Sequence, residues 1–448
     1  MKGKLLLIAL LLLVNAGYAQ TGDNAKLDQF FDRLAEKNKA MGSLTIAKEG
    51  QAVYTRAVGY SQISATEKKP LTGTNRFRIA SITKMFTAAM IMQLVEEGKL
   101  RLADTLSKFF PQIPNAAKIT IVQILGHRSG IPNVKRVGDR QGNISSKDPI
   151  TKDEMLALIT KSEPDFEPGT RHLYSNAGYF LLGLLLEKLT GKSYEEALQQ
   201  RICSKIGLKD TYTATGNIDV AKNESLTYMS LGGEWKQMPE THPSILFGAG
   251  QIISTPNDLV KFVQALFDGK IVSKESLELM KTMREGEGLG MEPFTFAGKT
   301  FYGHTGGGDN YGAWLAYLPE EKLAIAYTTN AKVYPVANIM SGIVDIYYHQ
   351  PFVIPGFETI AVSPEVLDKY VGVYSTPGAP VKFTISRKDT TLYIQPGEQS
   401  AAPLEAVSEN KFEVAPGVAF EFDADKKTMT QKRGGLERVF TKIKDFKQ

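Results

Sequence analysis

A serine and a lysine three residues apart, Ser81 and Lys84, have the types and spacing of a nucleophile and its base. They begin a stretch, residues 81–97, that lacks Gly and Pro and is largely apolar, which predicts a buried helix closed by Gly98. Residues three apart share a helix face, so the amine of Lys84 can reach the Ser81 oxygen. Burial lowers the pKa of a lysine, which would let Lys84 accept the serine proton.

This spacing alone is weak support, because it recurs at Ser408 and Lys411. The second copy lies in a strand-like run, where alternation points the two side chains to opposite faces. A helix-capping role is the alternative for Ser81. Other chemical groups are therefore needed to support a nucleophile.

Tyr174-Ser-Asn176 follows a turn at residues 167–170 and precedes a second apolar helix, predicted over residues 179–190 and ended by Gly191. A tyrosine in such a connection can carry a proton between nucleophile and leaving group. Asn176 can orient a substrate carbonyl and contact Lys84. The alternative is a tyrosine packed on the helix, with Asn176 as its N-cap.

His304-Thr305-Gly306 is followed by Gly307 and a further glycine. A glycine-rich strand edge lets a ligand backbone approach closely, so this segment could bind an extended substrate. One N–H group there, together with that of Ser81, could form an oxyanion hole. A flexible glycine loop with a surface histidine is the alternative.

These three elements, in this order, resemble the serine β-lactamase and penicillin-binding protein superfamily. The likeness is strongest to its class C β-lactamase, D-alanyl-D-alanine carboxypeptidase and esterase branch, and it covers about residues 25–350. It includes further segments at residues 125–132, 168–170, 207–211 and 248–255.

The resemblance implies an acyl-enzyme on Ser81, with Lys84 and Tyr174 as the proton-transfer pair. It implies an oxyanion hole from the N–H groups of Ser81 and Gly307, and a substrate site that contains Asn176, His304, Thr305 and Gly306. The expected substrate is a small molecule or peptide with an acyl carbonyl, and neither a metal nor an organic cofactor is required.

Two features depart from the β-lactamase pattern. His304 stands where most β-lactamases have lysine, and a mostly neutral histidine grips a substrate carboxylate less firmly. No separate carboxylate can be assigned as a deacylating base, since Glu167 belongs to a Pro-Gly turn. Both departures favour an amidase, peptidase or esterase. A β-lactamase proper and a non-catalytic penicillin-recognising or cell-wall-binding receptor remain the alternative functions.

The fold class expected is α+β, with an antiparallel sheet flanked by helices and an all-helical subdomain, as in β-lactamases and transpeptidases. Strands are predicted at residues 43–47, 52–58, 313–318 and 323–328, and helices at 27–37 and 258–267. Residues 20–350 would form this catalytic domain and 351–364 a linker. Short alternating runs over residues 365–448 predict an all-β accessory domain, either a meander or a small barrel.

The N-terminus has a basic start, an apolar run over residues 5–14 and small residues at Gly17 and Ala19. This is typical of a secretory signal peptide, predicted here as residues 1–19, so we expect a periplasmic or secreted protein without stable membrane insertion after cleavage. The net charge of +5 over 448 residues, without a dense basic run, argues against a nucleic-acid partner. Cys203 is the single cysteine and is expected to be buried rather than reactive. The five histidines show no pair at zinc-ligand spacing, so no metal is predicted.

Overall fold

The computed structural model describes residues 24–134, 148–231, 234–308, 310–377, 381–397, 401–415, 418–433 and 436–445. The predicted signal peptide lies outside these ranges. Within them, no helix has both the length and the apolar character needed to cross a membrane.

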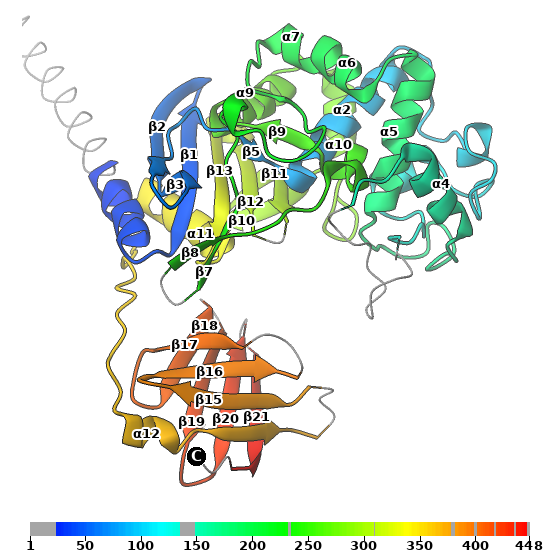
Figure 1. The fold of residues 1–448 in the computed structure, drawn as a ribbon. Helices are drawn as coiled ribbons and strands as arrows, with labels where there is room; N and C mark the ends of the chain where they lie inside the picture. Colours follow the sequence, from blue (N-terminus) through cyan, green and yellow to red (C-terminus); the bar gives the residue numbers. More distant parts are fainter. Residues whose placement is uncertain are drawn as a thin grey trace, which may run out of the picture.

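A six-stranded antiparallel sheet is the centre of the larger part of the molecule (Figure 1). Its order is β10 (Glu292–Phe296), β11 (Lys299–Gly307), β12 (Gly312–Leu318), β13 (Leu323–Lys332), β1 (Ala40–Lys48) and β2 (Gln51–Val58). The β1–β2 hairpin thus pairs with β13 from the far end of the domain, with Leu44 opposite Tyr327. The prediction of one sheet built from distant segments is confirmed.

The two faces of the sheet are covered by different helices, and β13 shows why. Its side chains alternate, so that Ala324 and Ala326 join one core while Ile325 and Tyr327 join the other. The first core contains α2 (Thr83–Glu96) and α9 (Pro256–Phe267). The second contains the helix at residues 24–36 and α11 (Val336–Tyr347). The central strands β1, β12 and β13 are therefore buried on both sides.

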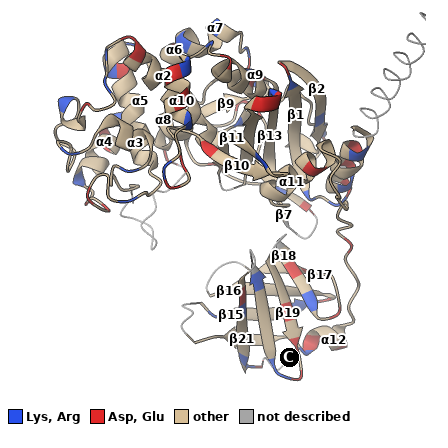
Figure 2. Ribbon diagram, turned by 180° about the vertical axis from the view of Figure 1, so that it is seen from behind, with Lys and Arg blue, Asp and Glu red and all other residues tan. Residues whose placement is uncertain are grey.

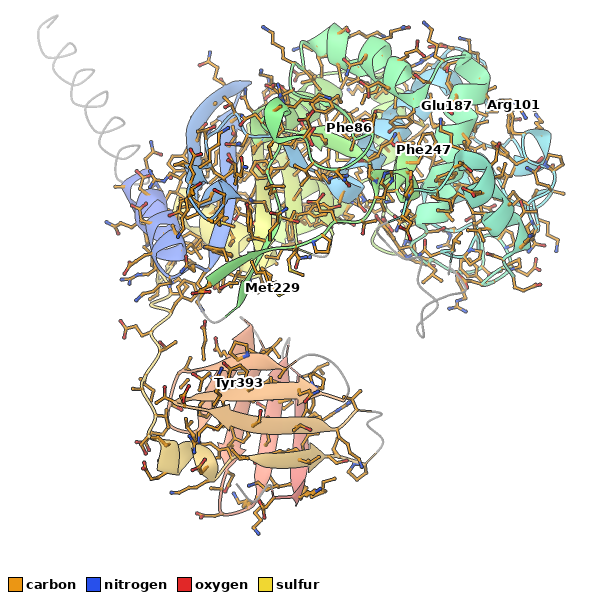
Figure 3. All side chains as sticks on the ribbon, viewed as in Figure 1. Phe86, Arg101, Glu187, Met229, Phe247 and Tyr393 are labelled. Atoms are coloured by element: carbon orange, nitrogen blue, oxygen red, sulfur yellow. The ribbon has the colours of Figure 1, made fainter. Side chains whose placement is uncertain are left out.

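A helical layer extends the first core away from the sheet (Figure 1). Its members are α3 (Ile121–Leu125), α4 (Lys152–Lys161), α5 (Asn176–Thr190), α6 (Tyr194–Leu198), α7 (Ser204–Ile206), α8 (Phe247–Gly250) and α10 (Lys274–Lys281). Gly191 follows α5 and Gly269 follows α9, both at positive φ, as predicted for helix ends. Phe86 of α2, which is labelled in Figure 3, stacks on Phe262 of α9, and the ring centroids are 3.6 Å apart.

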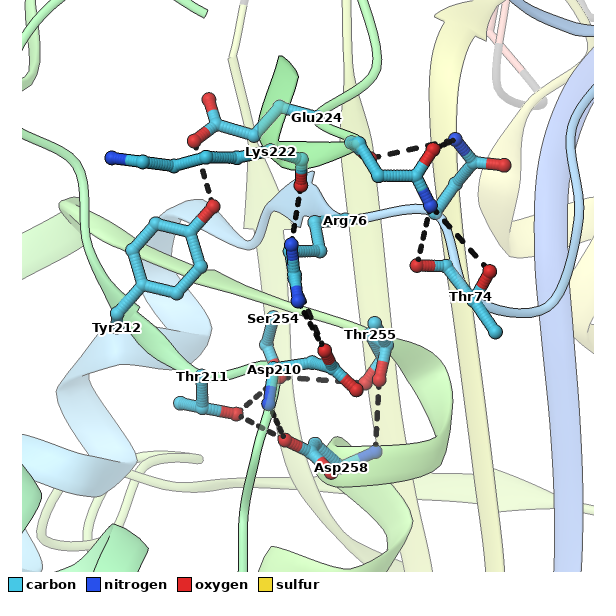
Figure 4. A network of polar contacts seen from close by, with 12 residues as sticks. Thr74, Arg76, Asp210, Thr211, Tyr212, Lys222, Glu224, Ser254, Thr255 and Asp258 are labelled. Carbon is cyan, nitrogen blue, oxygen red and sulfur yellow. Dashed lines mark hydrogen bonds and ion pairs between the residues drawn. The ribbon is translucent and has the colours of Figure 1, made fainter. Parts of the chain in front are cut away.

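A small three-stranded sheet fixes the chain just before the start of α2. β5 (Phe77–Arg78) and β6 (Tyr212–Thr213) both pair with β9 (Ile252–Ser254). A polar network holds this region together (Figure 4). In it, Arg76 donates to Asp210 at 2.6 Å, and the buried Asp258 accepts from Thr211 at 3.0 Å. The segment that carries Ser81 therefore starts from a fixed position.

The C-terminal part is a closed, eight-stranded antiparallel barrel. Its strands are β14 (Gly372–Ser375), β15 (Phe383–Lys388), β16 (Thr391–Pro396), β17 (Ala402–Ala406), β18 (Lys411–Ala415), β19 (Val418–Asp423), β20 (Thr428–Arg433) and β21 (Leu436–Lys444). The predicted all-β character is confirmed, and closure selects the barrel over the open meander. The short helix α12 (Pro364–Asp368) precedes it, and its core is separate from the other two.

Two small hairpins complete the fold, β3 (Tyr60–Ile63) with β4 (Lys68–Pro70) and β7 (Tyr228–Leu231) with β8 (Glu234–Gln237). Lysines, arginines, aspartates and glutamates are spread over both parts of the chain (Figure 2). Cys203 is buried, as expected, and burial raises the pKa of its thiol to about 12. A thiol in that state is a poor nucleophile at neutral pH.

Candidate active site

Ser81 lies in the 3₁₀ turn η1 (Ala80–Ile82), two residues before the α-helix α2 begins at Thr83. Ala80 has φ of 45°, a left-handed conformation that is strained for any residue with a side chain. The N–H of Ile79 donates to Ile252 O at 3.0 Å, which ties the turn to β9. Ser81 is partly exposed while its neighbours Ala80 and Ile82 are buried. This turn therefore holds one hydroxyl at the surface of an otherwise buried segment.

Lys84 is fully buried and makes three polar contacts. Its Nζ lies 3.1 Å from Ser81 Oγ, 2.8 Å from Asn176 Oδ1 and 2.8 Å from the carbonyl oxygen of Ala249. Burial lowers the pKa of Lys84 from 10.5 to about 7, although the charges of Glu287 and Glu292 oppose the shift. Near neutral pH a large fraction of the amine is therefore uncharged.

The partners of Lys84 determine where its lone pair points. The oxygens of Asn176 and Ala249 can only accept hydrogen bonds, so the two N–H groups of a neutral amine go to them. The remaining lone pair then faces Ser81 Oγ, which carries a proton that it can donate. This arrangement is that of a base aimed at a hydroxyl.

Tyr174 completes the group. Its hydroxyl shares a hydrogen bond with Ser81, and the Lys84 Nζ lies 4.7 Å from the centre of its ring. The ring of His127 stacks on that of Tyr174 with centroids 4.3 Å apart, and Asn133 Nδ2 donates to the Tyr174 carbonyl at 3.0 Å. Burial raises the pKa of Tyr174, so the side chain is a neutral phenol that can give up its proton only as it receives another.

Asn176 is the first residue of α5, three residues before the predicted helix start. Its N-cap is Ser175, whose hydroxyl accepts from the N–H of Gly178, so the alternative in which Asn176 caps the helix is wrong. The side chain of Asn176 is free of the capping role and contacts Lys84, as predicted. The N–H of Asn176 donates to Asn133 Oδ1 at 2.7 Å.

The segment His304-Thr305-Gly306 lies near the end of β11, and the structure shows why its last residue is a glycine. A Cβ on Gly306 would lie 2.1 Å from the carbonyl oxygen of Ile79, so only glycine lets β11 approach the turn that carries Ser81. Thr305 is partly exposed and Gly307 is exposed. His304 is buried, which overturns the alternative of a surface histidine, and burial lowers its pKa to about 3. It is neutral at pH 7 and offers no positive charge to a substrate.

Sequence reasoning missed two carboxylates beside this group. Thr305 Oγ1 donates to Glu292 Oε2 at 3.3 Å, and Glu292 lies at the start of β10. Glu287 accepts from His172 at 2.5 Å and lies 3.4 Å from His127 Nε2. Burial raises the pKa of both carboxyl groups.

The segment that carries the two carboxylates is positioned by another glycine. Gly290 has φ of +77°, and a Cβ there would lie 2.6 Å from Ala88 Cβ and 2.9 Å from the carbonyl oxygen of Lys84. The loop between α10 and β10 can therefore lie directly against α2. The segment Glu287-Gly-Leu-Gly290 matches no motif, so the sequence alone did not indicate that Glu287 and Glu292 lie near the site.

Three of the five histidines, His127, His172 and His304, gather around this group although they are scattered in sequence. One ring nitrogen of His304 and one oxygen each of Glu287 and Glu292 lie within 4.8 Å of one another. Nitrogen and carboxylate oxygen are zinc ligands, so these are the residues that could hold a metal ion in the described part of the chain. Glu167, by contrast, is exposed and pairs with Lys118, consistent with a structural role.

Comparison with known proteins assigns the chain to a family. The family model described as Beta-lactamase matches residues 27–341. The chain belongs to this family. Penicillin-binding protein 4* of Bacillus subtilis is 26% identical over 415 residues, which cover 86% of this chain and 90% of that protein.

Two solved structures are similar to this chain. The D-amino acid amidase from Ochrobactrum anthropi has a TM-score of 0.64 at 26% identity, covering 73% of this chain and 99% of the amidase. The octameric penicillin-binding protein homologue from Pyrococcus abyssi has a TM-score of 0.64 at 27% identity, covering 93% of this chain and 99% of the homologue. The protein is thus a serine hydrolase of the β-lactamase family with the corresponding α+β fold.

Proposed function

We propose that the protein is an exported hydrolase that cleaves an amide or ester through an acyl-enzyme on Ser81. Neutral Lys84 takes the proton of Ser81 as Oγ attacks the substrate carbonyl carbon. Tyr174 passes a proton to the leaving group and regains one from Lys84. Water then attacks the ester carbonyl, and the same two groups return a proton to Ser81 as the acid leaves.

The observation that carries this proposal is the environment of Lys84, whose Nζ contacts Ser81, Asn176 and Ala249. A fully buried amine with a pKa of about 7, placed 3.1 Å from a serine oxygen, has few other roles. The N–H groups of Gly307, which is an exposed residue, and of Ser81 are the proposed oxyanion donors. His304, Thr305 and Gly306 line the proposed substrate side of β11.

Among acyl donors, the site supports amides and esters over β-lactams. A neutral His304, with Glu292 at Thr305, gives a substrate carboxylate no positive partner at the third sequence element. The relatives named as a D-amino acid amidase and a penicillin-binding protein are compatible with either class of acyl donor. A chromogenic cephalosporin turned over faster than a short-chain nitrophenyl ester would contradict this preference.

Ser81→Ala tests the nucleophile directly. We expect the wild-type protein to gain one phosphonyl group at Ser81 from a fluorophosphonate, detected by mass spectrometry, and the variant to gain none. The variant should keep the wild-type melting temperature, since Ser81 is partly exposed. Turnover of a nitrophenyl ester by Ser81→Ala at the wild-type rate would disprove the assignment, and a wild-type protein that takes up no label would favour the receptor alternative.

Export rests on the N-terminal sequence alone. Expression with a bacterial secretion system and N-terminal sequencing of the mature protein would test it. A mature chain that begins near residue 20 is the expected result, and a chain that keeps residues 1–19 in the cytoplasm would contradict it.

A further inference from the structure

Three hydrogen-bond acceptors face one another beside Ser81. His304 Nδ1 lies 2.6 Å from the carbonyl oxygen of Thr305, which can only accept, so the proton of the neutral ring is on Nδ1. Nε2 is then a lone pair. It makes no hydrogen bond within the described part of the chain, although the residue is only 1% exposed. His304 Nε2 is therefore a buried hydrogen-bond acceptor without a partner, and it faces the carboxylate of Glu292.

The two carboxylates lie where that lone pair points. Glu292 Oε1 is 3.8 Å from His304 Nε2, and the donor atoms of Glu287, Glu292 and His304 are all within 4.8 Å of one another. Glu287 Oε1 lies 3.4 Å from His127 Nε2, which carries the proton of that neutral ring because Nδ1 accepts from the N–H of Ser175. Glu292 Oε1 and His304 Nε2 are two acceptors that face each other without a donor between them, so this pair fits a ligand that supplies positive charge and N–H donors.

Two such ligands require different spacings of the acceptors around them. A primary ammonium has three N–H donors at tetrahedral angles, and acceptors ~2.8 Å from its nitrogen are ~4.6 Å apart. Acceptors that bind zinc tetrahedrally at ~2.0–2.1 Å are only ~3.4 Å apart. The 3.8 Å between Glu292 Oε1 and His304 Nε2 lies between these two spacings, so bound zinc is measured alongside the competition by amines.

The cluster is in reach of a substrate that reacts at Ser81. Glu292 is 24% exposed and bonds Thr305, next to the proposed substrate glycines Gly306 and Gly307. The charges of Glu287 and Glu292 act on both Lys84 and Tyr174, which contact Ser81. A ligand between the carboxylates is therefore adjacent to the reacting groups.

We propose that the substrate carries a primary ammonium group that binds among Glu287, Glu292 and His304 while its carbonyl carbon lies at Ser81. This inference rests on the proposed function and names its substrate class, amides or esters that bear a free amine and no carboxylate at this position. The amine belongs either to the acyl part, as in an amino-acid amide, or to the leaving group.

Competition against phosphonylation of Ser81 by a neutral fluorophosphonate tests the proposal in the full chain. The competitors are alaninamide, with its amine in the acyl part, N-(2-aminoethyl)acetamide, with its amine in the leaving group, and neutral N-acetylalaninamide. We expect one of the two amines to protect Ser81 at a concentration at least about tenfold lower than the neutral amide, as charge-assisted hydrogen bonds would give. Equal protection by all three, or none by any, would overturn the proposal.

Variants show whether the carboxylates cause the difference. Glu292→Gln should remove the advantage of the amine, whereas Glu285→Gln should keep it, because Glu285 is exposed and pairs with Arg128 away from the cluster. Quaternary trimethylated alaninamide, which has the charge but no N–H donor, should protect no better than the neutral amide.

The other outcomes are distinguishable. Zinc that survives dialysis in the wild type and is lost in Glu292→Gln would make the cluster a metal site and overturn the proposal. A wild-type protein that is not labelled at all would instead disprove the proposed function. The comparison among competitors in the wild type stands even if a variant does not fold.

Discussion

At the scale of single residues, the chemistry of the site depends on where one amine sits. Lys84 donates its N–H groups to two oxygens, and burial away from water lowers its pKa to about 7. Burial raises the pKa of Tyr174 instead. One group is thereby a base at neutral pH while its neighbour stays protonated, which separates the two proton-transfer roles.

The pH dependence of acylation should report this base. Only neutral Lys84 can accept the serine proton, so kcat/KM for a nitrophenyl ester should rise with pH and reach half its maximum near pH 7. The negative charge of Glu287 favours protonated Lys84, so Glu287→Gln should move the midpoint to lower pH. Glu285→Gln, a change at an exposed carboxylate, should leave it in place. A midpoint that moves to higher pH in Glu287→Gln would contradict the assignment of Lys84.

The sequence could predict part of the site because part of it is local. Lys84 follows Ser81 by three residues, so helix geometry alone brings the two together. Glu287 and Glu292 could not be predicted, since their position depends on how Gly290 packs against α2. His304 was placed on the right strand edge, but its burial depends on the neighbouring strands and helices. Ser408 and Lys411 form a hairpin turn, where Ser408 Oγ accepts from the N–H of Lys411, so this second copy of the spacing has a purely structural explanation.

At the scale of elements, the site exists because β11 and η1 touch. Gly306 allows that contact, and Ile79 carries the carbonyl oxygen that would collide with any side chain there. Helices α2 and α5 supply Lys84 and Asn176 from their first turns. The proposed catalytic groups therefore lie where the sheet meets the helical layer, and small shifts between the two would separate them.

Gly306→Ala tests this contact. The new Cβ would lie 2.1 Å from a backbone oxygen, so β11 must move away from η1, and we expect phosphonylation of Ser81 to slow at least about tenfold. Gly216→Ala is a matched control, since a Cβ there meets no atom within 4 Å. Equal labelling rates for both variants would mean that the close approach does not matter for the reaction.

Prediction of elements succeeded where patterns were strong and failed where strands were short and polar. The helices ending at Gly191 and Gly269 and the β1–β2 hairpin were predicted within a few residues. β17 and β20 show little alternation in sequence, because each buries few side chains, such as Leu404 and Met429. Their pairing depends on barrel closure, which no local pattern reports.

At the scale of the whole molecule, the barrel contributes no described contact to Ser81, Lys84 or Tyr174. Its core is separate, and its contacts with the rest of the chain include an ion pair between Lys39 and Glu405 and a backbone bond from Ile360 to Ala406. The two parts can therefore be separated experimentally.

Removal of residues 364–448 should leave the labelling of Ser81 by fluorophosphonate at the wild-type rate. None of the described contacts of Ser81, Lys84 or Tyr174 comes from the barrel. A truncated protein that folds, by circular dichroism, but reacts tenfold more slowly would assign the barrel a part in catalysis.

The pairing of β1 with β13 has a consequence for biosynthesis. A ribosome makes β1 early, yet its partner on one side, with Leu44 opposite Tyr327, is translated last among the strands of the sheet. The N-terminal hairpin must therefore wait, with its apolar side chains unprotected, until nearly the entire hydrolase domain has been synthesised. A fragment that stops at residue 310 should remain susceptible to protease and unreactive toward fluorophosphonate. Adding residues 311–350 as a separate peptide tests whether the pairing of β13 with β1 is what makes Ser81 reactive.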